Sequence, residues 1–276
     1  MLRYLVGVLR QSRPPGVLIG VGPEQNFSYI AAAQPQMAFI VDIRREIRNL
    51  HLVYKALFEL SKTRTEFLGR LFAREEPKGS SAREMFADLM ALPSDLAKLD
   101  RTVADVRQVL QRRHKFSLSD DDVRDVLTIL TAFNTEGPAI NWWGDTFHRS
   151  VDFMSLNAME GVAGVGVSFL GSEQSFGFVK SLHARNLIIP VIGDFAGQKA
   201  LRDVADYVRN HHETVGVFYG SNVDTFLTSE QLQSFCANLA VLPTNARSVY
   251  IGGDGGKLAG VYAFPVALTM CSAISQ

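Results

Sequence analysis

Short apolar runs alternate with helical patterns at both ends of the chain. The first run, 17–19, stops at a glycine turn, and a stretch of helical composition then leads to a second run at 37–41. Later strand-like runs begin near 187, 214, 246 and 261, again with helical patterns between them. Strands that alternate with helices are typical of a parallel sheet covered on both faces. The pattern predicts an α/β fold with a doubly wound, mostly parallel, Rossmann-like sheet.

The middle of the chain has a helical period instead. Apolar residues spaced three or four apart from Ile43 to Arg74 predict one long helix. Further helices are expected at 82–92, after Ser94, and from a cap at Ser119 to about 133. Because residues 62–135 have almost no strand character, we expect a single domain, 1–276, with a helical insertion at about 62–135.

The composition and charge of the chain limit the kinds of partner that we expect. The 276 residues carry no formal net charge, and 47% of them are apolar, which is enough for a large core. No basic stripe points to nucleic acid, and no apolar run is long enough to span a membrane. The two cysteines, Cys236 and Cys271, and the six histidines lack metal-ligand spacing, so no metal is expected. We expect two buried free thiols, a cytoplasmic location and possible homo-oligomers.

The glycine turn after the first strand is the strongest chemical signal. Gly20-Val21-Gly22-Pro23 precedes a helical stretch, and Asp42 ends the next strand. Such a turn brings backbone N–H groups and a helix N-terminus close to a ligand, and an acidic residue about 20 positions later accepts hydrogen bonds from ribose hydroxyls. A tight structural turn, and pairing of Asp42 with Arg44 or Arg45, are the alternatives.

Two later strand ends carry similar candidates. Gly193-Asp194-Phe195 suits an adenine, because a carboxylate accepts from the exocyclic amine while the ring stacks. The alternative for Asp194 is a cap on the next helix. Tyr219 and Asn222 follow another strand. Because ligands bind at the carboxyl edge of open α/β sheets, these turns are expected to converge on one crevice. Trp142-Trp143 is expected in the core or in a substrate wall.

These segments carry a resemblance. GVGPEQN, FIVDIRR, VIGDFAG and VFYGSNVDTFL together are similar to the S-adenosylmethionine-dependent methyltransferase fold. More narrowly, GVGPEQNFSYIAA, AFIVDIRREIRNLHLVYKALFELS, SEQSFGFVKSL and VIGDFAGQKALR resemble an uncharacterised bacterial family with a methyltransferase-like core. This resemblance covers most of the chain between Gly16 and Ile251.

The resemblance implies a role for each matching position. Gly20 and Gly22 face the methionine part and sugar of the cofactor S-adenosylmethionine, and Asp42 holds the ribose. Asp194 and Phe195 hold the adenine. The catalytic candidates, Tyr219 and Asn222, lie next to the transferred methyl group.

The chain departs from the methyltransferase pattern at two positions. Leu18 stands where an acidic residue is common, and Glu24 stands where a third glycine is usual. Glu24 either binds the amino group of the cofactor, blocks the site, or only stabilises the first helical turn.

The expected activity is methylation of a small molecule that uses S-adenosylmethionine. One alternative is an aminopropyltransferase of polyamine type, which needs extra carboxylates such as Asp145, Asp194 or Asp224. Another is a non-catalytic nucleoside-binding protein.

Overall fold

The chain forms two compact units. The computed structural model describes residues 2–141, 151–161, 164, 166–253 and 255–274. A sheet unit contains residues 1–48 and 186–276, and a helical unit contains residues 49–185. The helical unit therefore extends beyond the predicted range of 62–135 on both sides.

The sheet unit holds one six-stranded sheet. Its strands lie in the order β3-β2-β1-β4-β5-β6. The first five run parallel, and β6 pairs antiparallel with β5. Their bounds are β1 Val17–Gly20, β2 Met37–Asp42, β3 Ile188–Ile192, β4 Val215–Ser221, β5 Val249–Gly252 and β6 Gly260–Ala263. An α/β fold with a mostly parallel sheet is confirmed, and the five parallel strands begin close to the predicted positions.

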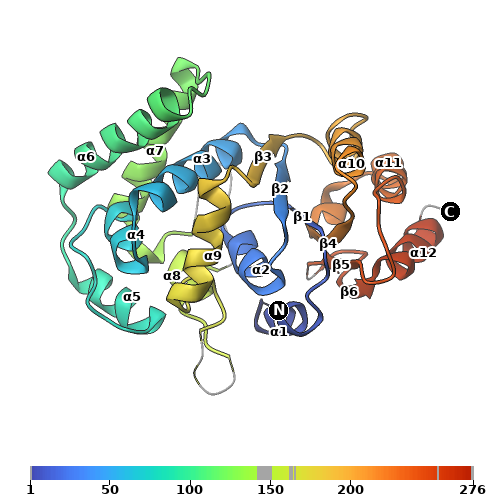
Figure 1. Ribbon diagram of the computed structural model, residues 1–276, viewed down its shortest axis with the longest axis horizontal. Helices are drawn as coiled ribbons and strands as arrows, with labels where there is room; N and C mark the ends of the chain where they lie inside the picture. Colours follow the sequence, from blue (N-terminus) through green and yellow to red (C-terminus); the bar gives the residue numbers. More distant parts are fainter. Residues whose placement is uncertain (1, 142–150, 162–163, 165, 254, 275–276) are drawn as a thin grey trace. The chain divides into compact units, whose positions relative to one another are not determined.

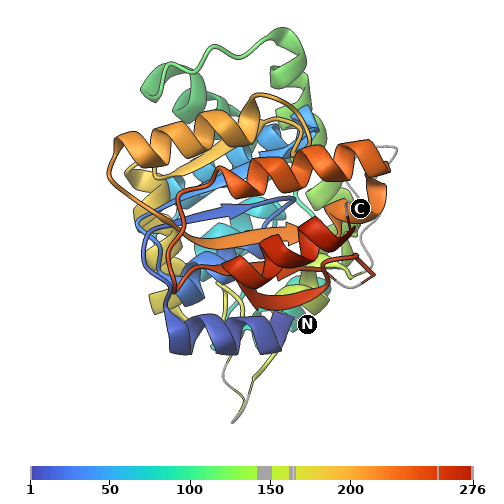
Figure 2. The ribbon, with the colours of Figure 1, turned by 90° about the vertical axis from the view of Figure 1, so that its right-hand side faces the viewer.

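Helices of this unit cover the two faces of the sheet. Val17 and Ile19 of β1 belong to an apolar cluster with α10 (Ala200–Asn210), α11 (Ser229–Ala240) and α12 (Phe264–Ile274). Figure 2 shows these three helices in front of the strands. Helices α1 (Leu2–Ser12) and α2 (Gln25–Ala33) pack together, and Figure 1 shows α2 on the other side of the strands. Successive side chains of a strand point to opposite faces, so β1 is buried on both.

The predicted last strand is shorter than expected. The apolar run from Val261 to Thr269 was expected to be one strand, but β6 ends at Ala263 and α12 follows at once. Pro265 lies in the first turn of α12, where its missing N–H costs no helical hydrogen bond. The Phe264 N–H donates to the carbonyl of Ser248 at 2.9 Å, which fixes the start of the helix against β5.

The helical unit packs around aromatic side chains. Its elements are α3 (Arg45–Leu60, which begins in the sheet unit), α4 (Arg64–Leu71), α5 (Ala82–Ala91), α6 (Leu96–Arg107), a π-helix (Gln108–Arg113), α7 (Asp120–Glu136), a 3₁₀ turn (Gly137–Ala139), α8 (Phe153–Asn157) and α9 (Glu173–Ala184). Buried rings in mutual contact form its core: Tyr54, Phe58, Phe67, Phe72, Phe133, Phe153, Phe169 and Phe176.

The predicted long helix, 43–74, is divided. Helix α3 ends at Leu60, and Thr63 caps α4 by accepting from the Glu66 N–H at 3.2 Å. Lys180 of α9 donates to the carbonyls of Phe58 and Ser61, which are left without helical partners where α3 stops. Apolar spacing continues through such a break, so the pattern alone does not reveal it.

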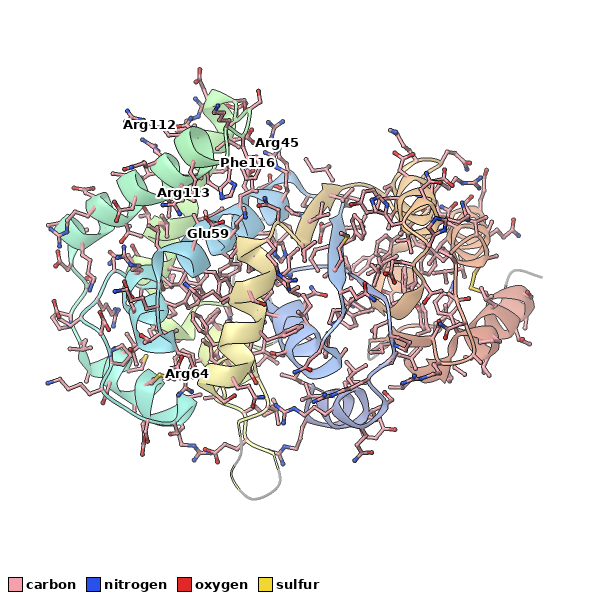
Figure 3. The ribbon with its side chains drawn as sticks, in the orientation of Figure 1. Arg45, Glu59, Arg64, Arg112, Arg113 and Phe116 are labelled. Carbon is pink, nitrogen blue, oxygen red and sulfur yellow. A yellow bond between two sulfur atoms is a disulfide. The ribbon has the colours of Figure 1, made fainter. Side chains whose placement is uncertain are left out.

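The prediction of two free thiols is wrong. Cys236 and Cys271 form a disulfide between α11 and α12, with Cα atoms 5.6 Å apart (Figure 3). That separation lies in the range a disulfide needs. The two cysteines are 35 residues apart in the chain, and only the packing of α11 against α12 brings them together. Among the described residues, no helix has the length and apolar character to cross a bilayer.

Candidate ligand site at the carboxyl edge of the sheet

The loops after the parallel strands meet at one edge of the sheet unit. The Gly193 N–H donates to the Asp42 carbonyl at 2.9 Å, and the Gly253 N–H donates to the Ser221 carbonyl at 2.6 Å. From β1 the chain passes to β2 and β3 on one side, and it returns to β4 on the other. The direction of winding thus reverses between β1 and β4, which is where open α/β sheets place their ligands.

An asparagine side chain fills the glycine turn from within. The Asn26 amide nitrogen donates to the carbonyls of Val21, Gly22 and Pro23 at 2.9, 3.3 and 2.9 Å. A Cβ at Gly20 would lie 2.0 Å from Asn26 Oδ1. Gly20 is therefore required because Asn26 approaches it, a structural reason that needs no ligand.

Gly22 has a different environment. Its φ of +81° lies in the left-handed region that glycine adopts without strain. Gly22 is buried, but beyond its two chain neighbours a Cβ at this position would meet no atom within 4 Å, so there is space on this side of the turn. Of the two glycines predicted to face the cofactor, Gly22 has the geometry that a close backbone approach requires.

Glu24 immediately precedes α2 and is fully buried. Its backbone is already helical, with φ −61° and ψ −9°, and its side chain makes no capping hydrogen bond to the first turn. Its carbonyl accepts from the Phe27 N–H at 2.9 Å. Burial of a carboxylate is costly, which makes Glu24 more than a solvated first-turn residue. Its proposed contact with the amino group of the cofactor stays a prediction.

Asp42 is held by an arginine. The Arg44 guanidinium donates to both carboxylate oxygens, from Nε to Oδ1 at 2.9 Å and from Nη2 to Oδ2 at 2.8 Å. The Arg44 N–H adds a third bond to Oδ1 at 3.0 Å. The carboxylate is 5% exposed, and the arginine is 30% exposed. This pairing is the alternative that the sequence left open, and a ribose that takes both oxygens must displace part of it.

Asp194 and Phe195 separate in the structure. Asp194 is exposed, and its Oδ1 accepts from the Ala196 N–H at 2.8 Å in a local turn. It does not cap α10, which begins at Ala200. The Phe195 ring is buried in the core, parallel to Phe235 with centroids 5.8 Å apart. The ring therefore has a protein partner in the position predicted to stack on adenine.

Tyr219 at the end of β4 lies against the helix that follows the glycine turn. Its hydroxyl accepts from Gln25 Nε2 at 3.3 Å, and its ring meets Tyr29 edge-on with centroids 4.8 Å apart. Gln25 also donates to the Tyr29 hydroxyl. Tyr219 is 7% exposed. These contacts join the end of β4 to the start of α2, across the reversal point of the sheet.

Asn222 begins a short 3₁₀ turn, Val223–Phe226. It is half-buried, and its carbonyl accepts from the N–H and the hydroxyl of Thr225 at 3.1 and 2.7 Å. The preceding Ser221 has a φ of +48°, so the chain turns sharply out of the sheet here. The Asn222 side-chain oxygen accepts from the Ser221 hydroxyl at 3.4 Å.

Asp224 connects this 3₁₀ turn to the loop after β5. It is 2% exposed, and its Oδ2 accepts from the Leu258 N–H at 2.7 Å. A Cβ at Gly256 would lie 2.4 Å from its Oδ1. Burial, and then the charge of Asp224, raises the pKa of the nearby Tyr250 hydroxyl. Asp224 thus binds the loop after β5 rather than facing outward as a polyamine carboxylate would.

Two residues that contact the glycine turn and β4 were not predicted from the sequence, and three predicted residues are not described. Trp142, Trp143 and Asp145 lie outside the described residues. Asn26 and Gln25 were missed, although they directly follow the turn. A polar side chain in the first turn of a helix is ordinarily solvated, and only the fold shows that these two point into the glycine turn and toward β4.

The chain was also compared with known proteins. Residues 9–257 match the family described as "Domain of unknown function (DUF7790)". This chain belongs to that family. No curated protein matches it.

The family match includes the helical unit and all five parallel strands. It begins within α1 and ends at Lys257, just before β6. Each predicted site residue, from Gly20 to Asn222, lies inside the match. The antiparallel strand β6, the helix α12 and therefore Cys271 lie after it.

Proposed function

We propose that this protein is an S-adenosylmethionine-dependent methyltransferase that acts on a small molecule, with a methyltransferase-like, Rossmann-like sheet. The observation that carries the proposal is the reversal point between β1 and β4. Gly22 with the space beside it, the buried carboxylate of Glu24 and the hydroxyl of Tyr219 belong to the elements that flank it. A nucleoside-bearing cofactor needs backbone N–H groups, a carboxylate and a polar strand end in this arrangement.

The residues fit the cofactor in part. Gly22 has room for a close approach, and Asp42 is a nearly buried carboxylate at the end of the adjacent strand. With Phe195 in the core, the adenine contact rests on the exposed Asp194. When bound, the cofactor supplies an electrophilic methyl group. The work left to the chain is to position an acceptor in line with that methyl and to exclude water.

Tyr219 and Asn222 are the groups suited to position the acceptor. Gln25 and Tyr29 fix the orientation of the Tyr219 hydroxyl, and the 3₁₀ turn fixes the backbone of Asn222. A hydroxyl and a carboxamide both donate and accept hydrogen bonds, so together they are able to orient a hydroxyl, amine or thiol acceptor. The neutral charge of the chain is in keeping with a small acceptor rather than nucleic acid.

The decisive test is binding of S-adenosylhomocysteine, the product form of the cofactor, to the purified full chain by calorimetry. Asp42→Ala is expected to weaken binding by about tenfold or more, because it removes charged hydrogen bonds to the ribose. Arg44→Ala is expected to leave binding unchanged or tighter, because Arg44 competes for the same oxygens. Asp206→Asn on α10 removes an exposed carboxylate and serves as the matched control.

Three outcomes decide between the hypotheses. Absence of binding to wild-type protein, measured with both S-adenosylmethionine and S-adenosylhomocysteine, contradicts the proposal. Equal affinity of wild type and Asp42→Ala removes the ribose role of Asp42. Tight binding without methyl transfer to any acceptor in a panel of small hydroxyl, amine and thiol compounds favours the non-catalytic nucleoside-binding alternative.

A further inference from the structure

Helix α12 is bonded to the rest of the sheet unit at two places. Its start is fixed by the hydrogen bond from Phe264 to Ser248, and Cys271 near its end is bonded to Cys236 of α11. Cys271 is 2% exposed, whereas Cys236 is only partly buried. An attacking thiolate therefore reaches the bond from the Cys236 side. These are the only two cysteines of the chain, so its thiol chemistry is confined to this pair.

The same C-terminal segment supports the turn that carries Asn222. Before α12 the chain forms β6, which pairs with β5, and before β6 the Leu258 N–H binds Asp224 at 2.7 Å. Asp224 lies in the 3₁₀ turn that Asn222 begins. The Gly253 N–H binds the Ser221 carbonyl at 2.6 Å and holds the other side of that turn. The turn at the end of β4 is thus held by backbone groups of the segment between β5 and α12.

We propose that the Cys236–Cys271 disulfide is a reversible redox latch that holds α12 on α11 and thereby stabilises the β5–β6 segment under Asn222. Oxidation joins the two Sγ atoms and releases two protons and two electrons. A small-molecule disulfide such as oxidised glutathione accepts them and becomes two thiols, and reduced glutathione reverses the step. Reduction leaves α12 held by its apolar packing and by the Phe264–Ser248 hydrogen bond at its start, so the helix and the segment before it open more often.

The latch is tested on the full chain in glutathione buffers that range from reduced to oxidised. Free thiols are alkylated with N-ethylmaleimide and counted by mass spectrometry, and the count is expected to change from two to zero in one two-electron transition. In the reduced buffer, amide hydrogen exchange is expected to rise in 264–274, in 255–259 and in 221–226, while 17–20 and 37–41 stay protected. The Tm is expected to fall by about 5–15 °C.

The double variant Cys236→Ser/Cys271→Ser is the matched control. Its exchange is expected to equal that of reduced wild type in every buffer, because it has no thiol to oxidise. Two free thiols in all buffers, or none even with excess reductant, overturn a reversible latch. Exchange that does not change on reduction, or that rises equally in all strands, shows that the bond does not act on the Asn222 turn and also overturns the proposal.

A binding measurement extends the test and rests on the proposed function. S-adenosylhomocysteine is expected to bind reduced wild type about fivefold or more weakly than the oxidised form, with no redox effect in the double variant. Equal affinity in the two forms removes the link to the site. Absence of binding in both forms contradicts the methyltransferase proposal instead, while the exchange result still decides the latch.

Discussion

Asn26 shows how one side chain shapes the glycine turn. Its carboxamide nitrogen donates hydrogen bonds to three successive carbonyls of the turn, and its oxygen occupies the space that a side chain at Gly20 would need. In a trans peptide the N–H points away from the preceding carbonyl. Carbonyls drawn toward Asn26 therefore direct the N–H groups of Gly22 and Glu24 away from it. Asn26 thus sets the orientation of two backbone N–H groups of the turn.

Gly20→Ala is expected to lower the free energy of unfolding by about 1–3 kcal/mol, because the new methyl meets Asn26 Oδ1 at 2.0 Å. The double variant Gly20→Ala/Asn26→Ala is expected to lose less stability than Gly20→Ala and Asn26→Ala lose in total, because without the Asn26 side chain the new methyl has no clash. Gly7→Ala is the control. It lies in α1 with nothing within 4 Å, so it is expected to stabilise by about 0.5–1 kcal/mol. Chemical denaturation measures the wild type and the four variants, and full additivity would show that the two residues do not interact.

Helices α3 and α9 stabilise each other's carboxyl ends. Lys55 of α3 donates to the carbonyl of His183 in the last turn of α9 at 2.7 Å. Lys180 of α9 donates to the carbonyls of Phe58, in the last turn of α3, and of Ser61, just after it. Positive charge is favourable at a helix C-terminus. Each lysine therefore provides a hydrogen-bond donor to unpaired helix carbonyls and interacts favourably with the negative end of the helix dipole. Burial lowers the pKa of the Lys180 ammonium group.

Glu59 links these helices to the π-helix. Its carboxylate accepts from Lys55 at 2.8 Å, from His114 at 2.8 Å and from Arg113 at 3.3 Å. Figure 3 labels Glu59 on α3 and Arg113 at the end of the π-helix. Burial by itself would raise the pKa of the Glu59 carboxyl, but hydrogen bonds from Lys55 and His114 hold it below its usual value. The cluster connects α3 to the end of the π-helix, and Lys55 extends it to α9 through its bond to the His183 carbonyl.

Lys180→Met keeps the length of the side chain and removes its hydrogen bonds to α3. It is expected to lower the free energy of unfolding by about 1–3 kcal/mol, because two carbonyls lose a charged donor. Lys199→Met, at a side chain that is 86% exposed, is the control and is expected to change stability by less than about 0.5 kcal/mol. Urea denaturation gives both values. A loss for Lys180→Met no larger than that of the control would mean that water replaces the lysine at these carbonyls.

On the scale of the whole molecule, the buried His183 sets a pH limit on the helical unit. Burial, and then the neighbouring Lys55 and His51, lowers its pKa well below the usual value. Its ring stacks on Phe58 with centroids 4.7 Å apart. The folded protein therefore keeps His183 neutral at pH values where the unfolded chain binds a proton. Stability is full above the unfolded pKa of about 6.5, and it falls as the pH decreases below that value.

The free energy of unfolding is expected to decrease as the pH is lowered from 6.5. His183 is expected to contribute up to about 1.4 kcal/mol of this decrease for each pH unit. His183→Gln removes the titrating group, so its stability is expected to depend less on pH between 6.5 and 5, whatever its stability at pH 7.5. His211→Gln, at the exposed histidine that follows α10, is the control and is expected to keep the wild-type slope. Denaturation curves at several pH values give the slopes. Parallel curves for wild type and His183→Gln would show that His183 is not the responsible group.

Much of the architecture follows from local patterns in the sequence. The five parallel strands begin near the predicted residues because apolar runs ended by glycine or acidic residues mark strands directly. Ser119 caps α7, as expected, because a hydroxyl before a helical run accepts from the N–H three residues later, and Thr228 caps α11 in the same way. These features depend on neighbours within a few residues, which the sequence displays.

Only the tertiary structure decided which side chains meet. Asp42 and Arg44 are two residues apart, yet their pairing depends on how the chain leaves β2, and Phe195 is buried because α11 brings Phe235 against it. The disulfide depends on the packing of α11 against α12. The sequence by itself determined the five parallel strands and the sheet edge that holds the candidate site. Contacts between distant segments depend on strand order and helix packing, so the fold alone determined the partners of the residues at that edge.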